Sequence, residues 1–421
     1  MSEKTIGKTL ERVKWLALLA LPLVPLSTNA AWVVEPSANL QTRYDDNVRS
    51  QQVNEENGLV TTIGGQARLR NIQEASEVSI LAGVNLTKYS GVDSFDNDER
   101  ESFFFDGRAL RRFERSQIRV GASYRRQDLL RFFRVLDADD VSAAPEEIAE
   151  EDLLEEPDVG DDLLTDVEVD VGSTEFLVQR DRVNISPQFS YSVSPRSSVA
   201  LNLGYYEVSY DDPSPVSSFQ DSESRSVGVA YQHQLSPRTT VSVEVDAQEF
   251  EPEQGLEADS YSLTASWQSA LTERLRLSIA VGARRTETDF FDDTGMIFNG
   301  RLTRQFENGT LFTTLARTLS ASGFGDQVES DRITVGYRRN LNDRLSWRVD
   351  VRAFQTETLS RFQQDNTRDF VRVETSLQYR YSRDWRTSLG FRHSWIDRST
   401  EQDDVTSNAV TLSVEYVPPR R

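Results

Sequence analysis

The chain has 421 residues, no cysteine, 37% hydrophobic residues and a formal net charge of −21. Without cysteine there can be no cysteine-linked lipid anchor, disulfide framework or thiolate metal site. Nothing in the sequence calls for nucleic acid or a cofactor, and we expect neither.

Residues 1–30 have the pattern of an export signal. The segment from Trp15 to Leu26 is apolar, and Thr28-Asn29-Ala30 offers small residues for cleavage. The basic residues before it are Lys4, Lys8, Arg12 and Lys14. An uncleaved anchor is the alternative, but the apolar run is too short to span a bilayer stably. The pattern predicts a cleaved signal peptide at 1–30 and a mature domain at 31–421.

The mature chain repeats one pattern, alternating apolar and polar residues broken by turns. In 275–284, Leu275, Leu277 and Val281 fall on one face, with arginine and small residues on the other. A barrel wall between lipid and water requires this period of two. No apolar run after residue 30 is long enough for a membrane-spanning helix. We therefore predict an all-β fold, a transmembrane antiparallel up-and-down β-barrel of about 18 strands.

The connections support this count because short and long ones alternate without a break. Short connections fall near 73–76, 114–116, 194–197, 235–238, 271–273, 307–309, 341–343 and 382–384. Long polar ones fall near 45–58, 89–100, 131–175, 211–221, 251–258, 288–294, 320–330, 357–367 and 398–405. Short turns belong in the periplasm and long loops outside the cell. We expect both termini to be periplasmic, with sixteen and twenty strands as alternative counts.

Residues 36–48 carry a family resemblance. They combine a proline, an alternating strand and Tyr44-Asp45-Asp46-Asn47 at the first outer loop. This resembles the opening of the type 2 family of β-barrel porins, and the motif covers residues 36–48 alone. The resemblance implies an outer-membrane barrel associated with exopolysaccharide or capsule biosynthesis. The end departs from the usual terminal aromatic residue, and we expect Tyr416 to take that role.

A strongly acidic segment lies in the long loop 131–175. Sixteen Asp and Glu residues fall between Asp137 and Asp170 without a single Lys or Arg. One interpretation folds this loop into the lumen as a constriction; the other leaves it solvated outside, as runs of like charge usually are. The constriction candidates are Asp137, Glu146, Glu150, Glu155, Asp161 and Asp162.

Two residue types test the barrel interpretation along the strands. Tryptophans at 32, 267, 347, 385 and 395 fall near predicted strand ends, where interfacial aromatic girdles belong.

Pro187 interrupts an otherwise good strand, and we expect a bulge there because proline removes a ladder donor.

Arginine dominates the positions predicted to face the lumen. The pore-lining candidates are Arg119, Arg125, Arg274, Arg276, Arg284, Arg338, Arg348, Arg352, Arg372, Arg380, Arg386 and Arg392. Carboxylates are interspersed, at Glu244, Asp246, Asp350, Glu374 and Glu415. These charges either brace the wall through ion pairs or form a pore that favours anions.

An outer-membrane enzyme would need a positioned base, usually histidine. The chain has only His233 and His393, and both share a face with apolar residues. We therefore predict a channel and not an enzyme, with no catalytic, cofactor or metal site. It would serve exopolysaccharide or capsule export or maturation. A barrel that is a structural partner in an export complex, and a lipid-modifying enzyme, remain alternatives. The expected partners are outer-membrane lipid and lipopolysaccharide, the barrel assembly machinery and polysaccharide export proteins.

Overall fold

The structure, a computed structural model, describes residues 32–50, 55–92, 99–129, 178–211, 219–253, 256–289, 292–321, 327–358, 368–398 and 404–418. The predicted signal peptide and the acidic loop candidates Asp137, Glu146, Glu150, Glu155, Asp161 and Asp162 lie outside these residues. None of these residues belongs to a helix with the length and hydropathy needed to span a bilayer.

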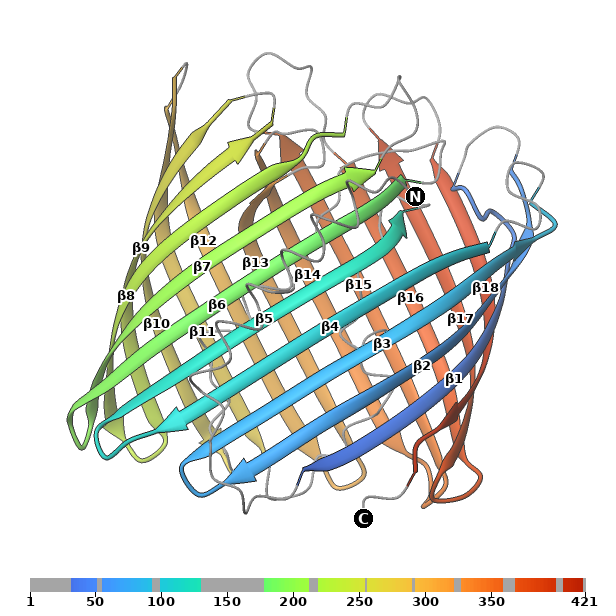
Figure 1. Cartoon of the computed structure of the whole chain (residues 1–421), viewed down its shortest axis with the longest axis horizontal. Helices are drawn as coiled ribbons and strands as arrows, with labels where there is room; N and C mark the ends of the chain where they lie inside the picture. The colour runs from blue at the N-terminus through green and yellow to red at the C-terminus, as the bar shows by residue number, and fades with distance from the viewer. Residues whose placement is uncertain are drawn as a thin grey trace.

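The described residues form one closed antiparallel barrel of 18 strands (Figure 1). Each strand pairs with the next along the chain, and β1 pairs with β18 to close the ring. The strands are β1 Val33–Asp45, β2 Gly58–Gln73, β3 Ser76–Ser90, β4 Glu99–Arg112, β5 Ser116–Leu129, β6 Val178–Ser194, β7 Ser197–Asp211, β8 Ser222–Ser236, β9 Thr239–Pro252, β10 Ala258–Thr272, β11 Leu275–Thr288, β12 Asp292–Phe306, β13 Gly309–Ala321, β14 Gln327–Asn340, β15 Leu345–Thr358, β16 Arg368–Arg380, β17 Trp385–Arg398 and β18 Val405–Tyr416. The predicted fold class and strand count are confirmed.

The strand ends that flank the short connections lie at one end of the barrel, which we call the short-turn end (Figure 1). The strand ends that flank the long connections lie at the other, which we call the loop end. A local hydrogen bond recurs in the short turns, where a side-chain oxygen accepts from the backbone N–H two residues later. Ser194 accepts from Arg196, Ser236 from Arg238, and Thr272 from Arg274, each at 3.2 Å. A hydrogen bond of this kind stabilises a tight turn. The shared bond explains why these turns have similar sequences, with Ser or Thr two residues before Arg.

Alternation along each strand separates two faces of the wall. On the outer face, Val281 is 43% exposed and pairs with Ala265 and Phe298. Arg284 and Thr286 of the same strand lie on the inner face and are buried. Large apolar side chains exposed around a whole barrel suit a hydrocarbon environment and not water. The outer face is therefore a surface for lipid.

Aromatic side chains mark the short-turn end of this apolar surface. Tyr337 packs edge-on against Trp347 at 6.1 Å, and Trp385 packs against Tyr416 at 5.0 Å between ring centroids. These rings point outward from β14, β15, β17 and β18. They have the placement of an interfacial girdle. Tyr416 belongs to it from the last strand.

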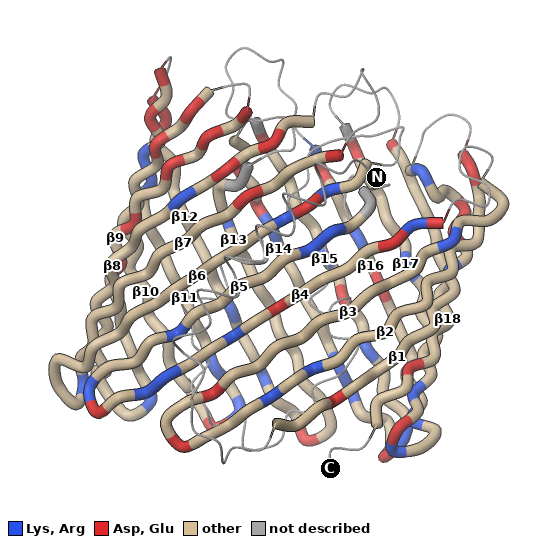
Figure 2. Tube along the Cα trace, in the orientation of Figure 1, with Lys and Arg blue, Asp and Glu red and all other residues tan. Residues whose placement is uncertain are grey.

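Charges mark the opposite limit of the apolar surface. Acidic residues gather toward the loop ends of the strands (Figure 2). On the outer face there, Arg225 lies 2.6 Å from Glu223 and within 4 Å of Glu249 and Glu251. A group of exposed charges of this kind belongs outside the hydrocarbon layer. The lipid-facing band therefore ends below these residues.

The Asp45-Asp46-Asn47 segment closes the barrel where β1 meets β18. Asp46 accepts hydrogen bonds from the backbone N–H and the side-chain amide of Asn408, at 2.6 and 2.8 Å. Asp45 accepts from the Ser407 hydroxyl at 2.8 Å, and Asn47 donates to the Thr406 carbonyl at 3.1 Å. The motif that carries the family resemblance thus joins the first strand to the last.

The bulge expected at Pro187 is wrong. The β6–β7 register is the same before and after this residue, from Ile185–Tyr205 to Gln188–Asn202. Two rungs are missing between these pairs, so the absent proline N–H is accommodated without an extra residue. The register shift in this pair of strands lies instead at Ser192/Ser194.

Candidate functional site

The inner wall of the barrel is the candidate functional site. The register places all of the predicted pore-lining arginines on the inner face of a strand except Arg274, which lies in the β10–β11 turn. The predicted inward carboxylates Glu244, Asp246, Asp350, Glu374 and Glu415 lie on the same face.

Arginine pairs recur as direct cross-strand rungs of this wall. Arg352 lies opposite Arg372, and Arg338 lies opposite Arg348. Three more rungs of this kind are Arg380–Arg386, Arg368–Arg398 and Arg125–Arg182. Like charges directly opposite each other destabilise a sheet, so these rungs have a cost for folding. Because five such rungs lie on the inner face, they make it strongly positive, and a positive surface attracts negative charge.

Carboxylates lie in the rows between these arginine rungs on β15 to β17. Asp350 lies opposite Glu374, one row from the Arg352–Arg372 rung. Arg392 on β17 donates to Glu374 on β16 at 3.3 Å and so joins two strands, whereas Arg348 donates to Asp350 at 2.6 Å within β15. The wall therefore has both features that the sequence suggested, an ion pair that joins neighbouring strands and rows of arginine.

A chain of hydrogen-bonded polar side chains, which we call the polar belt, crosses the inner face from β5 to β9. Arg119 donates to Gln188 at 3.3 Å, Gln188 to Asn202 at 3.0 Å, and Asn202 to Glu244 at 2.8 Å. Gly228 on the intervening β8 pairs with both Asn202 and Asp246, and its missing side chain lets the belt pass. This belt ties an arginine to a carboxylate across five strands.

Further inward arginines were missing from the sequence prediction. They are Arg43, Arg68, Arg70, Arg100, Arg108, Arg112, Arg180, Arg182, Arg301, Arg332, Arg368 and Arg398. The alternation that placed the others would also have found these, because each lies two residues from another inward position. With them, arginines clearly outnumber carboxylates on the inner wall.

An apolar cluster on the inner face was not expected. Phe354, Phe370, Ile396 and Val405 lie side by side on β15 to β18 near the loop end, each at most 5% exposed. The Phe354 and Phe370 ring centroids are 4.6 Å apart, and the Arg372 guanidinium lies 5.1 Å from the Phe370 ring. The lumen is therefore polar along most of its wall but apolar at this position.

Neither histidine faces the lumen. His233 lies on the outer face beside Ser197, with 2.8 Å between its Nδ1 and the hydroxyl. His393 lies on the outer face and contacts the Asn408 side chain at 2.8 Å. In the part of the chain that the structure describes, no group of three or more His, Asp or Glu could hold a metal ion.

Comparison with solved structures gives distant similarities. No family model and no curated protein matches the chain. Among solved structures, it is similar to Pseudomonas aeruginosa OccK9 (OpdG), with 12% identity and a TM-score of 0.47 over 91% of this chain and 98% of that chain. It is also similar to Acinetobacter baumannii OccAB3, with 13% identity and a TM-score of 0.46 over 91% and 99%. A BenF-like porin from Pseudomonas fluorescens Pf-5 gives 11% identity and a TM-score of 0.46 over 92% and 99%. Similarities this low carry no inference about function, and the fold rests on the strand pairing itself.

Proposed function

We propose that this protein is an outer-membrane channel whose arginine-rich inner wall favours anionic solutes. The repeated Arg–Arg rungs on the inner face carry this proposal. A ring of positive charge around a polar lumen attracts anions and repels cations. The long loops would then face the outside, the short turns and both termini the periplasm, and the apolar band lipid and lipopolysaccharide.

For the solute, we propose an acidic polysaccharide of an exopolysaccharide or capsule pathway. Support comes from the resemblance of residues 36–48 and from arginine as a forked ligand for carboxylate groups. Polysaccharide export proteins would then be partners on the periplasmic side, and the barrel assembly machinery would insert the chain.

A structural partner with a closed lumen is the second candidate. Inward side chains near the loop end are almost completely buried: Val328 and Thr356 are 0% exposed and Phe370 is 2% exposed. Close packing at these positions favours a barrel that is filled at its loop end. Ion conduction separates this candidate from the channel.

The charge of the wall can be tested in planar bilayers. Replacing Arg352 and Arg372 together with Gln should lower the preference for anions, because a complete arginine rung disappears. The reversal potential in asymmetric KCl measures this preference. Arg304→Gln is the matched control, since Arg304 lies on the outer face against Phe306. An unchanged reversal potential would contradict anion selection by the wall, and absence of conductance in the wild type would favour the structural partner.

The acidic loop gives a separate expectation. If residues 140–170 fold into the lumen, deleting them should raise single-channel conductance and strengthen anion selectivity, because the wall loses its counter-charge. Partial shielding from bulk water would make that attraction stronger than a surface ion pair. An unchanged conductance and reversal potential after the deletion would instead place the loop outside the lumen.

A further inference from the structure

The barrel wall is split between β12 and β13 at the loop end. The ladder between these strands runs from Phe306–Gly309 to Phe298–Arg317. Beyond that rung β12 continues to Asp292 and β13 to Ala321, without a register pair between them. Their other neighbours stay paired, since β11–β12 reaches Glu287–Asp292 and β13–β14 reaches Ala321–Gln327. We call this unpaired stretch, residues 292–297 and 318–321, the seam.

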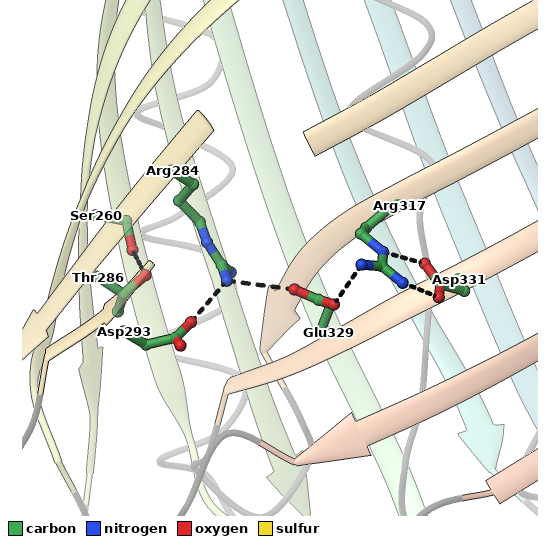
Figure 3. A network of polar contacts seen from close by, with 7 residues as sticks. All are labelled: Ser260, Arg284, Thr286, Asp293, Arg317, Glu329 and Asp331. Atoms are coloured by element: carbon green, nitrogen blue, oxygen red, sulfur yellow. Dashed lines mark hydrogen bonds and ion pairs between the residues drawn. The ribbon is translucent and has the colours of Figure 1, made fainter. Parts of the chain in front are cut away.

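Side chains from opposite faces of the wall meet across the seam (Figure 3). Arg284 comes from the inner face of β11, and its Nη2 lies 3.0 Å from Asp293 and 3.4 Å from Glu329. Glu329 pairs with Leu319 and belongs to the outer face of β14. In an unbroken sheet, three strand spacings of about 4.8 Å would separate β11 from β14, and opposite faces could not touch. The contact therefore requires the two edges to overlap.

Arg317 completes this network on the outer side. It lies 3.5 Å from Glu329 and forms a two-pronged ion pair with Asp331, whose Nε–Oδ1 distance is 2.5 Å. The side chains of Arg317 and Asp331 are each 41% exposed. Of these contacts, the Arg284–Glu329 ion pair is the one that crosses the seam, from β11 to β14. The Arg317 ion pairs lie between β13 and β14, which remain paired, and hold Glu329 at the edge of the seam.

One buried donor next to the seam, on β11, has no partner. The Arg284 side chain is 5% exposed, and its Nε is buried without a hydrogen-bond acceptor. A buried unsatisfied donor is unfavourable and suits an acceptor supplied by a ligand. On the outer face, Met296 belongs to the seam, and Phe298 and Leu315 lie next to it; Met296 is 59% and Leu315 41% exposed. A buried cation thus lies beside an apolar, lipid-facing surface.

We propose that the seam is a lateral portal between the lumen and the lipid for an amphiphile with an anionic head group. The head group replaces Glu329 on Arg284 and Arg317, and the apolar chain lies over Met296, Phe298 and Leu315. Ion pairs can exchange partners in this way without breaking any backbone ladder. The inference depends on a barrel in a membrane and not on ion conduction, so it can fail independently of the proposed channel.

Disulfide formation tests the split itself, on a chain that has no cysteine of its own. Continuing the β12–β13 register would place Met296 opposite Leu319, both on the outer face. Met296→Cys with Leu319→Cys should not oxidise to a disulfide but should be joined by a long bifunctional maleimide, because disulfides need Cα atoms within about 7 Å. Leu302→Cys with Thr313→Cys, a paired outer rung, is the control that should oxidise. Equal oxidation of both pairs would show that the ladder continues and would overturn the portal.

Photolabelling tests the ligand. The full-length protein in phosphatidylcholine nanodiscs, which contain no competing lipopolysaccharide, is exposed to a palmitic acid carrying a diazirine. Adducts should map to residues 296–298 and 315–319, and the alcohol of the same chain should label them much less. Arg284→Gln with Arg317→Gln should reduce this labelling roughly tenfold, as expected for a lost charge-assisted hydrogen bond.

A gain-of-labelling variant guards against misfolding. Glu329→Gln keeps both arginines but removes the competing carboxylate, so labelling should rise. Migration before and after heating shows whether each variant is folded. Labelling spread evenly over the outer face, or unaffected by both changes, would overturn the proposal.

Discussion

Replacing Asp46 with Ala should open the closure between β1 and β18. Asp46 accepts two hydrogen bonds from Asn408, at 2.6 and 2.8 Å, and its own N–H donates to the Asn408 carbonyl at 3.0 Å. A hydrogen bond to a charged group contributes about 1.5–3 kcal/mol, so losing two should lower the free energy of unfolding by about 3 kcal/mol or more. Unfolding in urea from lipid vesicles, followed by the heat-modifiable gel shift, measures this loss.

The register of β1 and β18 explains why we expect the Asp46 carboxylate to contribute so much to stability. The β1–β18 ladder ends at Asp45–Ala409, and the bonds of Asp46 and Asn47 carry the closure into the first loop. Elsewhere in the barrel, adjacent strands are also joined by a chain connection at one end. The joint between β1 and β18 has none, so it depends on pairing alone. Loss of these bonds therefore destabilises the point where the barrel can open.

Two controls separate the closure from a general effect of charge. Asp397→Ala removes an outward carboxylate at the loop end of β17, opposite Asp369, and should change the unfolding free energy little. Asn408→Ala combined with Asp46→Ala should cost clearly less than the sum of the single changes, because the residues share their bonds. Strict additivity, or an Asp397→Ala loss as large as that of Asp46→Ala, would contradict the closing role.

Most of the architecture could be predicted because its determinants are local. A period of two and the residues of short turns both act within a few positions, so the eighteen strands and their alternating connections follow from the sequence. Pro187 shows the limit of this reasoning. Its missing N–H would require a bulge only if the β7 ladder needed a donor there, and that depends on the partner strand.

For the site, the sequence predicts on which face of the wall a side chain lies, but not which side chains contact each other. Alternation assigns Arg352 and Arg372 to the lumen, but their direct opposition depends on the register between β15 and β16. The belt from Arg119 to Glu244 joins residues 125 positions apart, and no local pattern signals it. The inner apolar cluster around Phe370 contradicts the rule that the inner face is polar throughout. The seam likewise arises from a ladder that stops early, although both strands continue.

The assignment of the two faces leads to the other large expected effect. Val281 lies midway along β11, on the outer face between Ala265 and Phe298. An arginine facing lipid near the bilayer midplane costs about 2–4 kcal/mol. Val281→Arg should therefore reduce the amount of folded barrel in the membrane and lower the free energy of unfolding by this amount.

Ala280→Arg is the matched control, because it adds the same side chain one residue away. Ala280 lies on the inner face between Ser266 and Asn299, where a guanidinium can remain hydrated. It should assemble nearly as well as the wild type, and the added charge should increase anion selectivity if the lumen conducts. Quantitative blots of heat-modifiable protein in isolated membranes measure assembly of both variants. If the two substitutions are tolerated equally, β11 does not separate lipid from water at this level, and the inward assignment of Arg276 and Arg284 on the same strand is wrong with it.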